Sequence, residues 1–276
     1  MIEQKLKTAL DFLQKKTPFR PDIAITLGSG LGGFAETMEK IAVIDYAEIP
    51  GMPVSTAPSH AGKLVFGKLA GVNAAVLQGR VHLNEGYDVR ETVMPLRVLR
   101  MLGAKILLLT NSAGAINTDF ECGDFMLVED HISLLVPSPL RGKNPDFLGP
   151  RFPDMTCVYD KDLRRIADST AERAGIPLRH GVLVQTSGPN FETPAEVRFL
   201  KTMGADAVCM STVTEATAAR HCGYRVLALS CISNMAAGIS ETPLTQEEVM
   251  ATAQEKAPLF NRLLRDLAGA MAVFLN

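Results

Sequence analysis

Ser29 lies in a glycine-rich stretch, GSGLGG (residues 28–33), that directly follows an apolar run of this 276-residue chain. Glycines let backbone N–H groups approach an anion closely. The spacing of Gly28, Gly30 and Gly33 also fits the G-x-G-x-x-G pattern of dinucleotide-binding turns. The same residues therefore support either a site for a small anion or a site for a dinucleotide.

Arg80 and His82 stand two residues apart in QGRVHLNEGY, after the apolar run AAVLQG. If the chain stays extended there, alternate residues share one face and both side chains project together. A guanidinium beside an imidazole suits a tetrahedral oxyanion such as phosphate. A solvated edge strand carrying two unrelated polar residues is the alternative, and this pair alone leaves both interpretations open.

Glu192 and Asn234 are candidates for contacts with a heterocyclic base. Glu192 could accept hydrogen bonds from a ring N–H while Phe191 covers the ring, or it could simply stabilise the start of a helix. Asn234 follows the apolar run VLALSCIS, where a buried amide needs partners. Its donors and acceptor suit a purine, and a satisfied turn asparagine is the alternative. The lone histidines are expected at the surface: His60, His131, His180 and His221.

Alternating strands and helices must position these side chains. The pattern predicts helices at residues 1–16, 89–102, 161–174 and 213–222, one opening at Thr193-Pro194, and a long C-terminal helix. It predicts strands at residues 23–27, 105–110, 181–185, 206–210 and 225–232, a hairpin over 64–79, a small-residue turn at 111–115 and a long loop over 137–154. We therefore expect one domain over residues 1–276, with a mixed, largely parallel sheet covered by helices on both faces. Sites in such sheets collect at the carboxyl ends of strands, where small or polar residues follow the apolar runs: Ser29, Asn111, Ser112, Ser187, Ser211, Ser233 and Asn234.

The composition limits the classes of partner. A formal net charge of −2 argues against nucleic acid and against a membrane surface, because both favour a basic excess. Five scattered cysteines without a C-x-x-C pair predict reduced thiols and no metal site. The N-terminal stretch is an amphipathic helix with no signal-peptide core, so we expect a cytoplasmic protein.

Several catalytic motifs are missing from the sequence. It contains no P-loop, no G-x-S-x-G elbow and no H-E-x-x-H. The stretch DYAEIPG (residues 45–51) breaks into turn residues where a dinucleotide-binding unit should carry its ribose-binding acid. The dinucleotide pattern is therefore interpreted as coincidental.

An ordered set of short motifs resembles the trimeric purine nucleoside phosphorylase family. The motifs span nearly the whole chain: GSGLGG, SHAG, QGRVHLNEGY, NSAGAIN, GPNFETPAE, DAVCMSTVTEA and the Ser233-Asn234 pair. The resemblance implies a single-domain α/β fold of the nucleoside phosphorylase type. It also implies a homotrimer that cleaves purine ribo- and deoxyribonucleosides with phosphate, with no cofactor. It further implies a preference for 6-oxopurines such as those of inosine and guanosine. Asn234 would donate hydrogen bonds to N7 and the 6-oxo group, and Glu192 would accept one from N1–H.

The resemblance also assigns roles to individual residues. Three would act in catalysis: His82, Glu192 and Asn234. Six would bind phosphate: Ser29, His60, Arg80, His82, Ser112 and Ser211. Six would bind the nucleoside, the last of them from a neighbouring subunit: Phe191, Glu192, Met210, Asn234, Gln246 and Phe152.

Four residues depart from the family pattern: Asn84 for tyrosine, Ser112 for alanine, Ser233 for threonine and Gln246 for histidine. Two rival functions follow from the same motifs. A purine nucleosidase would use water as the nucleophile and would not need phosphate. A non-catalytic nucleotide-binding module would use the glycine-rich turn and leave nucleosides unchanged.

Overall fold

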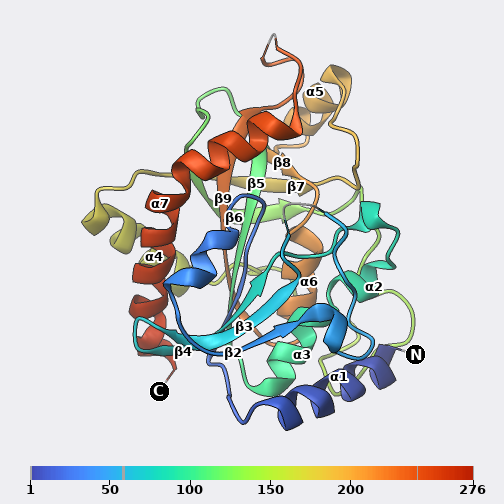
Figure 1. The fold of residues 1–276 in the computed structure, drawn as a ribbon. Helices are drawn as coiled ribbons and strands as arrows, with labels where there is room; N and C mark the ends of the chain where they lie inside the picture. The colour runs from blue at the N-terminus through green and yellow to red at the C-terminus, as the bar shows by residue number, and fades with distance from the viewer. Residues whose placement is uncertain (1, 58–59, 241, 276) are drawn as a thin grey trace.

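The computed structural model describes residues 2–57, 60–240 and 242–275 (Figure 1). The strands are β1 (Ile23–Thr26), β2 (Glu39–Asp45), β3 (Lys63–Leu69), β4 (Val72–Gln78), β5 (Ile106–Ala115), β6 (Phe125–Ile132), β7 (Leu178–Gln185), β8 (Ala207–Cys209) and β9 (Arg225–Met235). The α-helices are α1 (Ile2–Lys16), α2 (Val89–Thr92), α3 (Met94–Leu102), α4 (Lys161–Ala174), α5 (Pro194–Thr202), α6 (Val213–His221) and α7 (Gln246–Ala270). Short 3-10 helices are η1 (Gly32–Thr37), η2 (Tyr46–Glu48), η3 (Leu83–Glu85) and η4 (Met271–Phe274).

The strands form one sheet in the order β2-β3-β4-β1-β5-β8-β7-β6-β9. Because β9 also pairs with β5, the strands from β5 to β9 close into a ring, and β1 to β4 extend from it. The pairs of β1 with β4, β1 with β5, β5 with β9, β6 with β7 and β7 with β8 are parallel, and the other pairs are antiparallel. The predicted mixed sheet is confirmed.

Two hydrophobic layers cover the two faces of the sheet. Strand β1 alternates between them: Ala24 belongs to the layer under α1, α3 and α6, whereas Ile23 and Ile25 belong to the layer under α4 and α7. Figure 1 shows these two helix groups on opposite sides of the strands. Such alternation, with both faces apolar, is typical of strands buried between helical layers.

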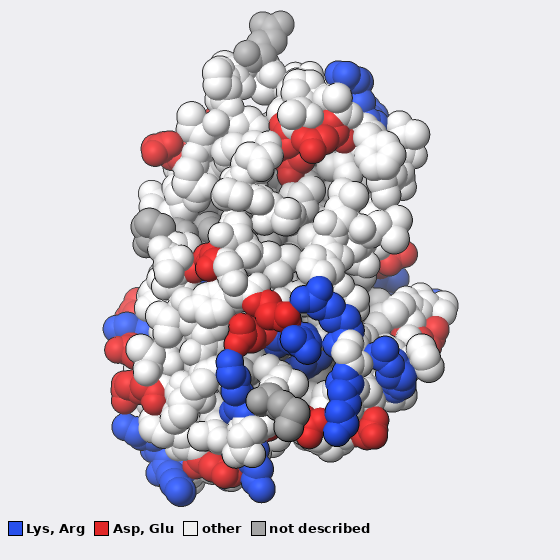
Figure 2. Space-filling view, turned by 90° about the vertical axis from the view of Figure 1, so that its right-hand side faces the viewer, with Lys and Arg blue, Asp and Glu red and all other residues white. Residues whose placement is uncertain are grey.

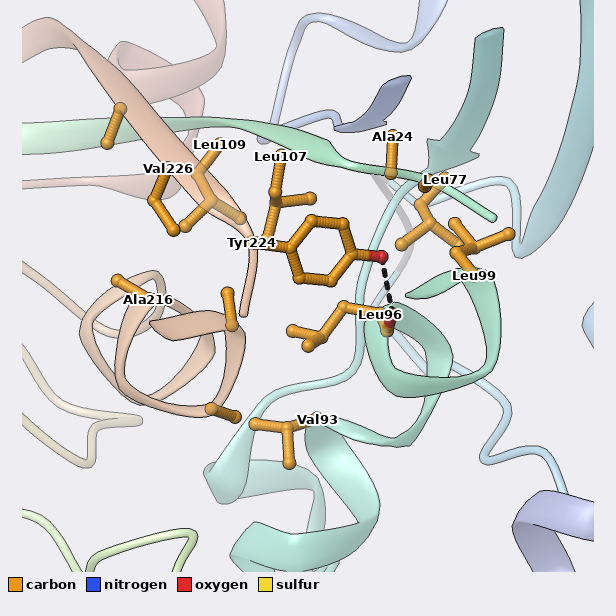
Figure 3. Packing of buried hydrophobic residues seen from close by; sticks show 14 of the residues in the cluster. Ala24, Leu77, Val93, Leu96, Leu99, Leu107, Leu109, Ala216, Tyr224 and Val226 are labelled. Carbon is orange, nitrogen blue, oxygen red and sulfur yellow. Dashed lines mark hydrogen bonds between the residues drawn. The ribbon is translucent and has the colours of Figure 1, made fainter. Parts of the chain in front are cut away.

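Tyr224 lies in the middle of the first layer, among side chains of β1, β5, α3 and α6 (Figure 3). Its ring is almost fully buried, and its hydroxyl donates a 2.7 Å hydrogen bond to the carbonyl oxygen of Leu96. A buried phenol needs such a partner, since an unpaired hydroxyl in an apolar layer is costly. The bond ties the start of β9 to α3.

The single helix predicted at residues 89–102 is wrong. The structure has two helices there, α2 and α3, which are separated at Val93. Pro95 has no N–H to offer the carbonyl of the fourth residue before it, and its ring crowds that carbonyl. Each piece begins independently: Asp88 caps α2 through the N–H of Arg90, and Pro95 occupies the first turn of α3, where proline is tolerated.

The small-residue turn predicted at residues 111–115 is wrong, because β5 continues through this stretch to Ala115. Its last residues remain in register with β9, where Ala115 opposes Met235. Ser233 and Asn234 likewise lie inside β9 and not after it. The small residues at the end of β5 leave space for the side chains of β9. At Gly114, for example, an added Cβ would lie only 3.0 Å from the Asn234 amide nitrogen.

Two strands were not predicted, β2 and β6. Strand β2 is an edge strand with charged ends and mostly exposed residues, so it lacks clear alternation. Strand β6 reads FMLVEDHI, which is apolar in its first half and polar in its second. Both patterns fall outside the alternating and continuous templates used for strands.

Candidate active site

A cavity of about 380 Å³ opens beside the second half of β5. Residues from the ends of β1, β4, β8 and β9, from the segment between β7 and α5, and from the start of α7 form its wall. Ten of the twelve predicted site residues line it: Ser29, Arg80, His82, Ser112, Phe191, Glu192, Met210, Ser211, Asn234 and Gln246. The two others, His60 and Phe152, do not.

The sheet explains why residues so far apart in sequence meet here. Ser29 and Arg80 follow two parallel strands, β1 and β4, as the carboxyl-end rule predicts. Ser211 arrives differently, because β8 runs antiparallel to β5. The chain leaving β8 therefore turns back along β5, and the Asn111 amide donates a 2.8 Å hydrogen bond to the hydroxyl of Thr212.

Arg80 is the cation of the cavity wall, and it is held from two sides. Its Nε lies 3.0 Å from Glu215 Oε2, and its Nη2 donates to the carbonyl of Thr110 at 2.7 Å. Both side chains of the ion pair are more than nine-tenths buried. A buried charge needs such a partner, and removing one partner of a pair like this is strongly destabilising. The guanidinium is therefore held in one position by contacts within the protein.

Glu215 is a functional residue that sequence analysis missed. It accepts from the N–H of Thr212 at 3.1 Å, completing a capping box at the start of α6, while it also pairs with Arg80. The T-x-x-E spacing was a readable signal of the cap. Only the fold shows that the same carboxylate faces Arg80.

His60 is buried, with 8% of its surface exposed, so the surface expectation for it is wrong. Its Nδ1 lies 2.8 Å from the backbone nitrogen of Arg80 and 2.6 Å from the carbonyl oxygen of the same residue. Its Nε2 lies 3.3 Å from Ser29 Oγ, and its ring centroid lies 5.1 Å from that of His82, with the two rings tilted by 39°. Burial lowers the pKa of His60 to about 4, so the ring is neutral at pH 7. His60 positions Ser29 and His82 from behind the wall.

His82 lines the cavity with Glu85 behind it. Its Nδ1 lies 3.4 Å from Glu85 Oε1, which also accepts the His82 N–H at 2.7 Å. Burial raises the pKa of Glu85, but hydrogen bonds from His82 and Thr56 outweigh this effect and lower it to about 2. The ionised carboxylate orients the imidazole and leaves Nε2 for a ligand.

The remaining histidines differ from one another. His180 is exposed, as predicted. His221 is almost fully buried, with Nε2 3.1 Å from Asn144 Oδ1, and His131 is half-buried, with Nδ1 3.0 Å from the hydroxyl of Tyr159. The surface expectation is therefore wrong for these two, because packing between elements distant in sequence decides their burial.

The glycine-rich turn is built by close packing. A Cβ on Gly28 would lie 2.6 Å from the backbone Cα of Asn111, so only glycine lets β1 end this close to β5. The Gly28 N–H donates to Thr110 Oγ1 at 3.0 Å, and the Ser112 hydroxyl donates to the carbonyl of Ser29 at 3.2 Å. These bonds hold Ser29 at the cavity wall.

Thr212 carries an unusual backbone conformation beside Ser211. Its φ of 77° and ψ of −50° are rare for a β-branched residue, and such strain collects at functional sites. The Asn111 amide and the Glu215 carboxylate hold it in place. The turn directs Ser211 into the cavity. Cys209 also lines the cavity, but burial raises the pKa of its thiol to about 12, so it is not a nucleophile.

The other end of the cavity carries an acid, an amide and an aromatic ring. Glu192 Oε1 accepts from Thr186 Oγ1 at 2.7 Å, which fixes the carboxylate at the wall. Asn234, 5% exposed, accepts at Oδ1 from the Ser233 hydroxyl at 2.9 Å and donates from Nδ2 to the carbonyl of Met235 at 3.1 Å. Phe191 lines the same end. Ser233 thus supplies the hydroxyl that orients the amide.

The arrangement can hold an oxyanion at one end and a flat polar heterocycle at the other. Within the described part of the chain, no group of three or more His, Cys, Asp or Glu could hold a metal ion. Residues 22–268 match the model of the phosphorylase superfamily. The chain is 46% identical to purine nucleoside phosphorylase 1 of Bacillus subtilis, over 96% of this chain and 97% of that protein. It belongs to the purine nucleoside phosphorylase family.

Other members of the purine nucleoside phosphorylase family agree in sequence and structure. The purine nucleoside phosphorylase of Bos taurus is 43% identical over 95% of this chain and 93% of that protein. The crystal structure of the Schistosoma mansoni purine nucleoside phosphorylase in complex with adenosine has a TM-score of 0.91 and 38% identity, covering 96% of both chains. The complex of that enzyme with inosine has the same TM-score at 37% identity. The predicted nucleoside phosphorylase fold is confirmed.

Gln246 lines the cavity of this family member, whereas Phe152 does not. Gln246 is the first residue of α7, is exposed, and lines the cavity mouth. Phe152 lies in the long connection between β6 and α4 and is 88% exposed. The long loop predicted over residues 137–154 is confirmed. Asn84 also lines the cavity, with its amide nitrogen 3.9 Å from the Met210 sulfur.

Proposed function

We propose that this chain catalyses the reversible phosphorolysis of 6-oxopurine nucleosides, giving the free base and (deoxy)ribose 1-phosphate. The observation that carries the proposal is the division of one cavity into two chemically different ends along β5. Arg80 and Ser29 contact Thr110 and Ser112, whereas the Asn234 amide lies beside Gly114. Ser29, Arg80, His82 and Ser211 offer a cation, an imidazole and hydroxyls at one end. Glu192, Asn234 and Phe191 offer a carboxylate, an amide and a ring at the other.

Phosphate would act as the nucleophile. One of its oxygens forms a bond to the anomeric carbon while the bond from that carbon to the purine nitrogen breaks, and the bonding pair leaves with the base. Phosphate needs orienting more than activating, so a pre-fixed guanidinium and aligned donors supply much of the rate enhancement. The ion pair of Arg80 with Glu215 supports this role, because it holds the guanidinium in place.

The purine would leave between Asn234 and Glu192. Negative charge grows on the five-membered ring and the 6-oxo group as the bond breaks, and a donated amide hydrogen stabilises it. Glu192 would accept from N1–H. This pairing favours hypoxanthine and guanine over adenine, whose N1 carries no hydrogen and whose 6-amino group donates instead of accepting.

A homotrimer would complete the site. Phe152 is a large aromatic residue exposed at 88% on a long loop, and it would enter the cavity of a neighbouring subunit. All five cysteines are free thiols, which supports a reducing, cytoplasmic location. Within the described residues, no helix is both long enough and apolar enough to cross a membrane.

The test is a panel of inosine, guanosine, xanthosine and adenosine, assayed with phosphate in the wild type and in Asn234→Asp. The wild type is expected to give the highest kcat/KM with a 6-oxopurine and a much lower value with adenosine. The variant should shift the ratio toward adenosine, because a carboxylate can accept from the 6-amino group. Since the Schistosoma relative is seen in complex with adenosine, turnover and not binding must be measured. Equal kcat/KM values for adenosine and inosine in the wild type would contradict the 6-oxopurine preference.

A further inference from the structure

A second recess lies away from the proposed active site and is the strongest unexplained feature of the molecule. It has a volume of about 440 Å³, within the range of small-molecule sites. Its wall comes from the start of α1, from α2 and α3, from residues 139–145 and from the end of α6. It shares no lining residue with the first cavity. The catalytic proposal therefore leaves this recess without a role.

Arg97 lies at the bottom of this recess and is only 2% exposed. Within the described residues no carboxylate pairs with it, and its Nε makes no hydrogen bond. Its Nη2 donates a long bond, 3.3 Å, to the carbonyl of Pro139, and the Cys222 thiol is a further hydrogen-bond partner of the guanidinium. Burial lowers the pKa of Arg97, and the neighbouring Cys222 thiol offsets part of this effect. A buried guanidinium without a counter-charge is costly unless an anion completes it.

The rim of the recess adds further positive charge. The lining includes five cations, Lys5, Arg90, Arg97, Arg141 and Lys143, and three anions, Glu3, Asp88 and Glu91, which leaves an excess of +2. Figure 2 views the molecule from this side and shows Lys and Arg side chains gathered around a hollow in the lower half, next to a smaller acidic group. Such an excess is notable in a chain whose formal net charge is −2.

Part of the rim charge is already used within the protein. Asp88 Oδ1 lies 2.9 Å from Arg90 Nε, and Asp88 Oδ2 lies 2.8 Å from Arg141 Nη2. These pairs are partly exposed and therefore weak, so an incoming anion can recruit both arginines without a large cost. Lys143 is exposed at the rim, and no ion pair of the described residues includes it.

We propose that this recess binds a small organic phosphomonoester. Guanidinium groups bind phosphoryl oxygens in paired, fork-like geometry, and Arg97 with Arg141 would supply two of them. The volume of the recess exceeds what inorganic phosphate needs. Ile2, Leu140 and Pro145 form an apolar part of the wall, against which the organic part of the ligand would pack. This site is independent of the proposed phosphorolysis, and its ligand would not be a reactant.

Calorimetric titration of the full chain with inosine 5′-monophosphate, ribose 5-phosphate and inorganic phosphate tests the proposal. The double variant Arg141→Gln/Lys143→Gln should weaken nucleotide binding at least tenfold. The double variant Arg20→Gln/Lys68→Gln removes the same charge from exposed positions outside the recess and should leave binding unchanged. Asn234→Ala, which alters the first cavity, should also leave it unchanged.

A third variant separates binding from a structural role of the buried cation. Arg97→Met keeps an unbranched stem of similar length, so it should abolish binding while the free energy of unfolding of the ligand-free chain does not fall. A clear loss of stability would show that Arg97 serves the fold, and would overturn the proposal.

Three other outcomes would also overturn it: absence of nucleotide binding, loss of nucleotide binding in Asn234→Ala, or unchanged nucleotide binding in Arg141→Gln/Lys143→Gln. A change in sedimentation coefficient in that double variant, without a change in nucleotide affinity, would instead assign the recess to a contact between copies of the chain.

Discussion

At the scale of single residues, the side chains behind the cavity wall determine what the wall can do. Glu215 fixes Arg80, Glu85 orients His82, and His60 contacts Ser29. Sequence motifs located the residues that line the cavity, because those residues stand in short strings near strand ends. The supporting contacts join residues up to 135 positions apart, as between Arg80 and Glu215, and only the fold brings them together.

His60 makes a prediction about acid stability. Its pKa falls from 6.5 to about 4 on folding, so between these values the unfolded chain binds more protons and stability decreases as the pH falls. A shift of this size corresponds to about 3 kcal/mol. Wild type should therefore lose about 3 kcal/mol more than His60→Gln between pH 7 and pH 4.

Urea unfolding at a series of pH values measures this difference. Other groups titrate in the same range, among them His131 and His221, whose pKa values are also lowered by burial. They contribute equally to both proteins, so the difference between the two curves isolates His60. Parallel curves for wild type and variant would show that His60 can be protonated in the folded chain.

At the scale of elements, the strength of each local pattern decided what could be predicted. Helix α4 was predicted with its observed bounds, because Asp160 caps it and Gly175 ends it in a left-handed conformation. The stretch 111–115 was misread as a turn, since small residues in a strand carry the same composition as a loop. Here β9 supplies the pairing that keeps β5 extended.

Gly28 gives a prediction at the junction of β1 and β5. Gly28→Ala would place a methyl group 2.6 Å from the Asn111 Cα, where only backbone movement can relieve the clash. We expect a loss of about 1–3 kcal/mol in stability, and a fall in kcat/KM because Ser29 and the Asn111 segment separate. Thermal unfolding and steady-state kinetics measure both effects.

Gly33→Ala is the matched control for this change. A Cβ at Gly33 meets no atom within 4 Å, so both the unfolding temperature and kcat/KM should stay close to wild type. If Gly28→Ala behaved like this control, the glycine would not be needed for strand packing at the site.

At the scale of the whole molecule, one aromatic side chain points to assembly. Phe152 is 88% exposed, more than any other large hydrophobic residue of the described chain. If it enters a neighbouring cavity, Phe152→Ala should lower kcat/KM for inosine at least tenfold while the free energy of unfolding of the subunit stays unchanged. Val273→Ala, which shortens another exposed side chain, should change neither quantity. Sedimentation at micromolar concentration should give a trimer, and a fully active monomer would contradict this prediction.

The central claim is that phosphate is the nucleophile, and the most direct measurement is the stoichiometry of inosine cleavage with and without phosphate. We predict one ribose 1-phosphate for each hypoxanthine released, and a fall of several orders of magnitude in rate when phosphate is removed. A hydrolase would release free ribose at the same rate in both conditions. That result would contradict the account, because the fixed Arg80 guanidinium and its neighbours would then have no phosphate to orient.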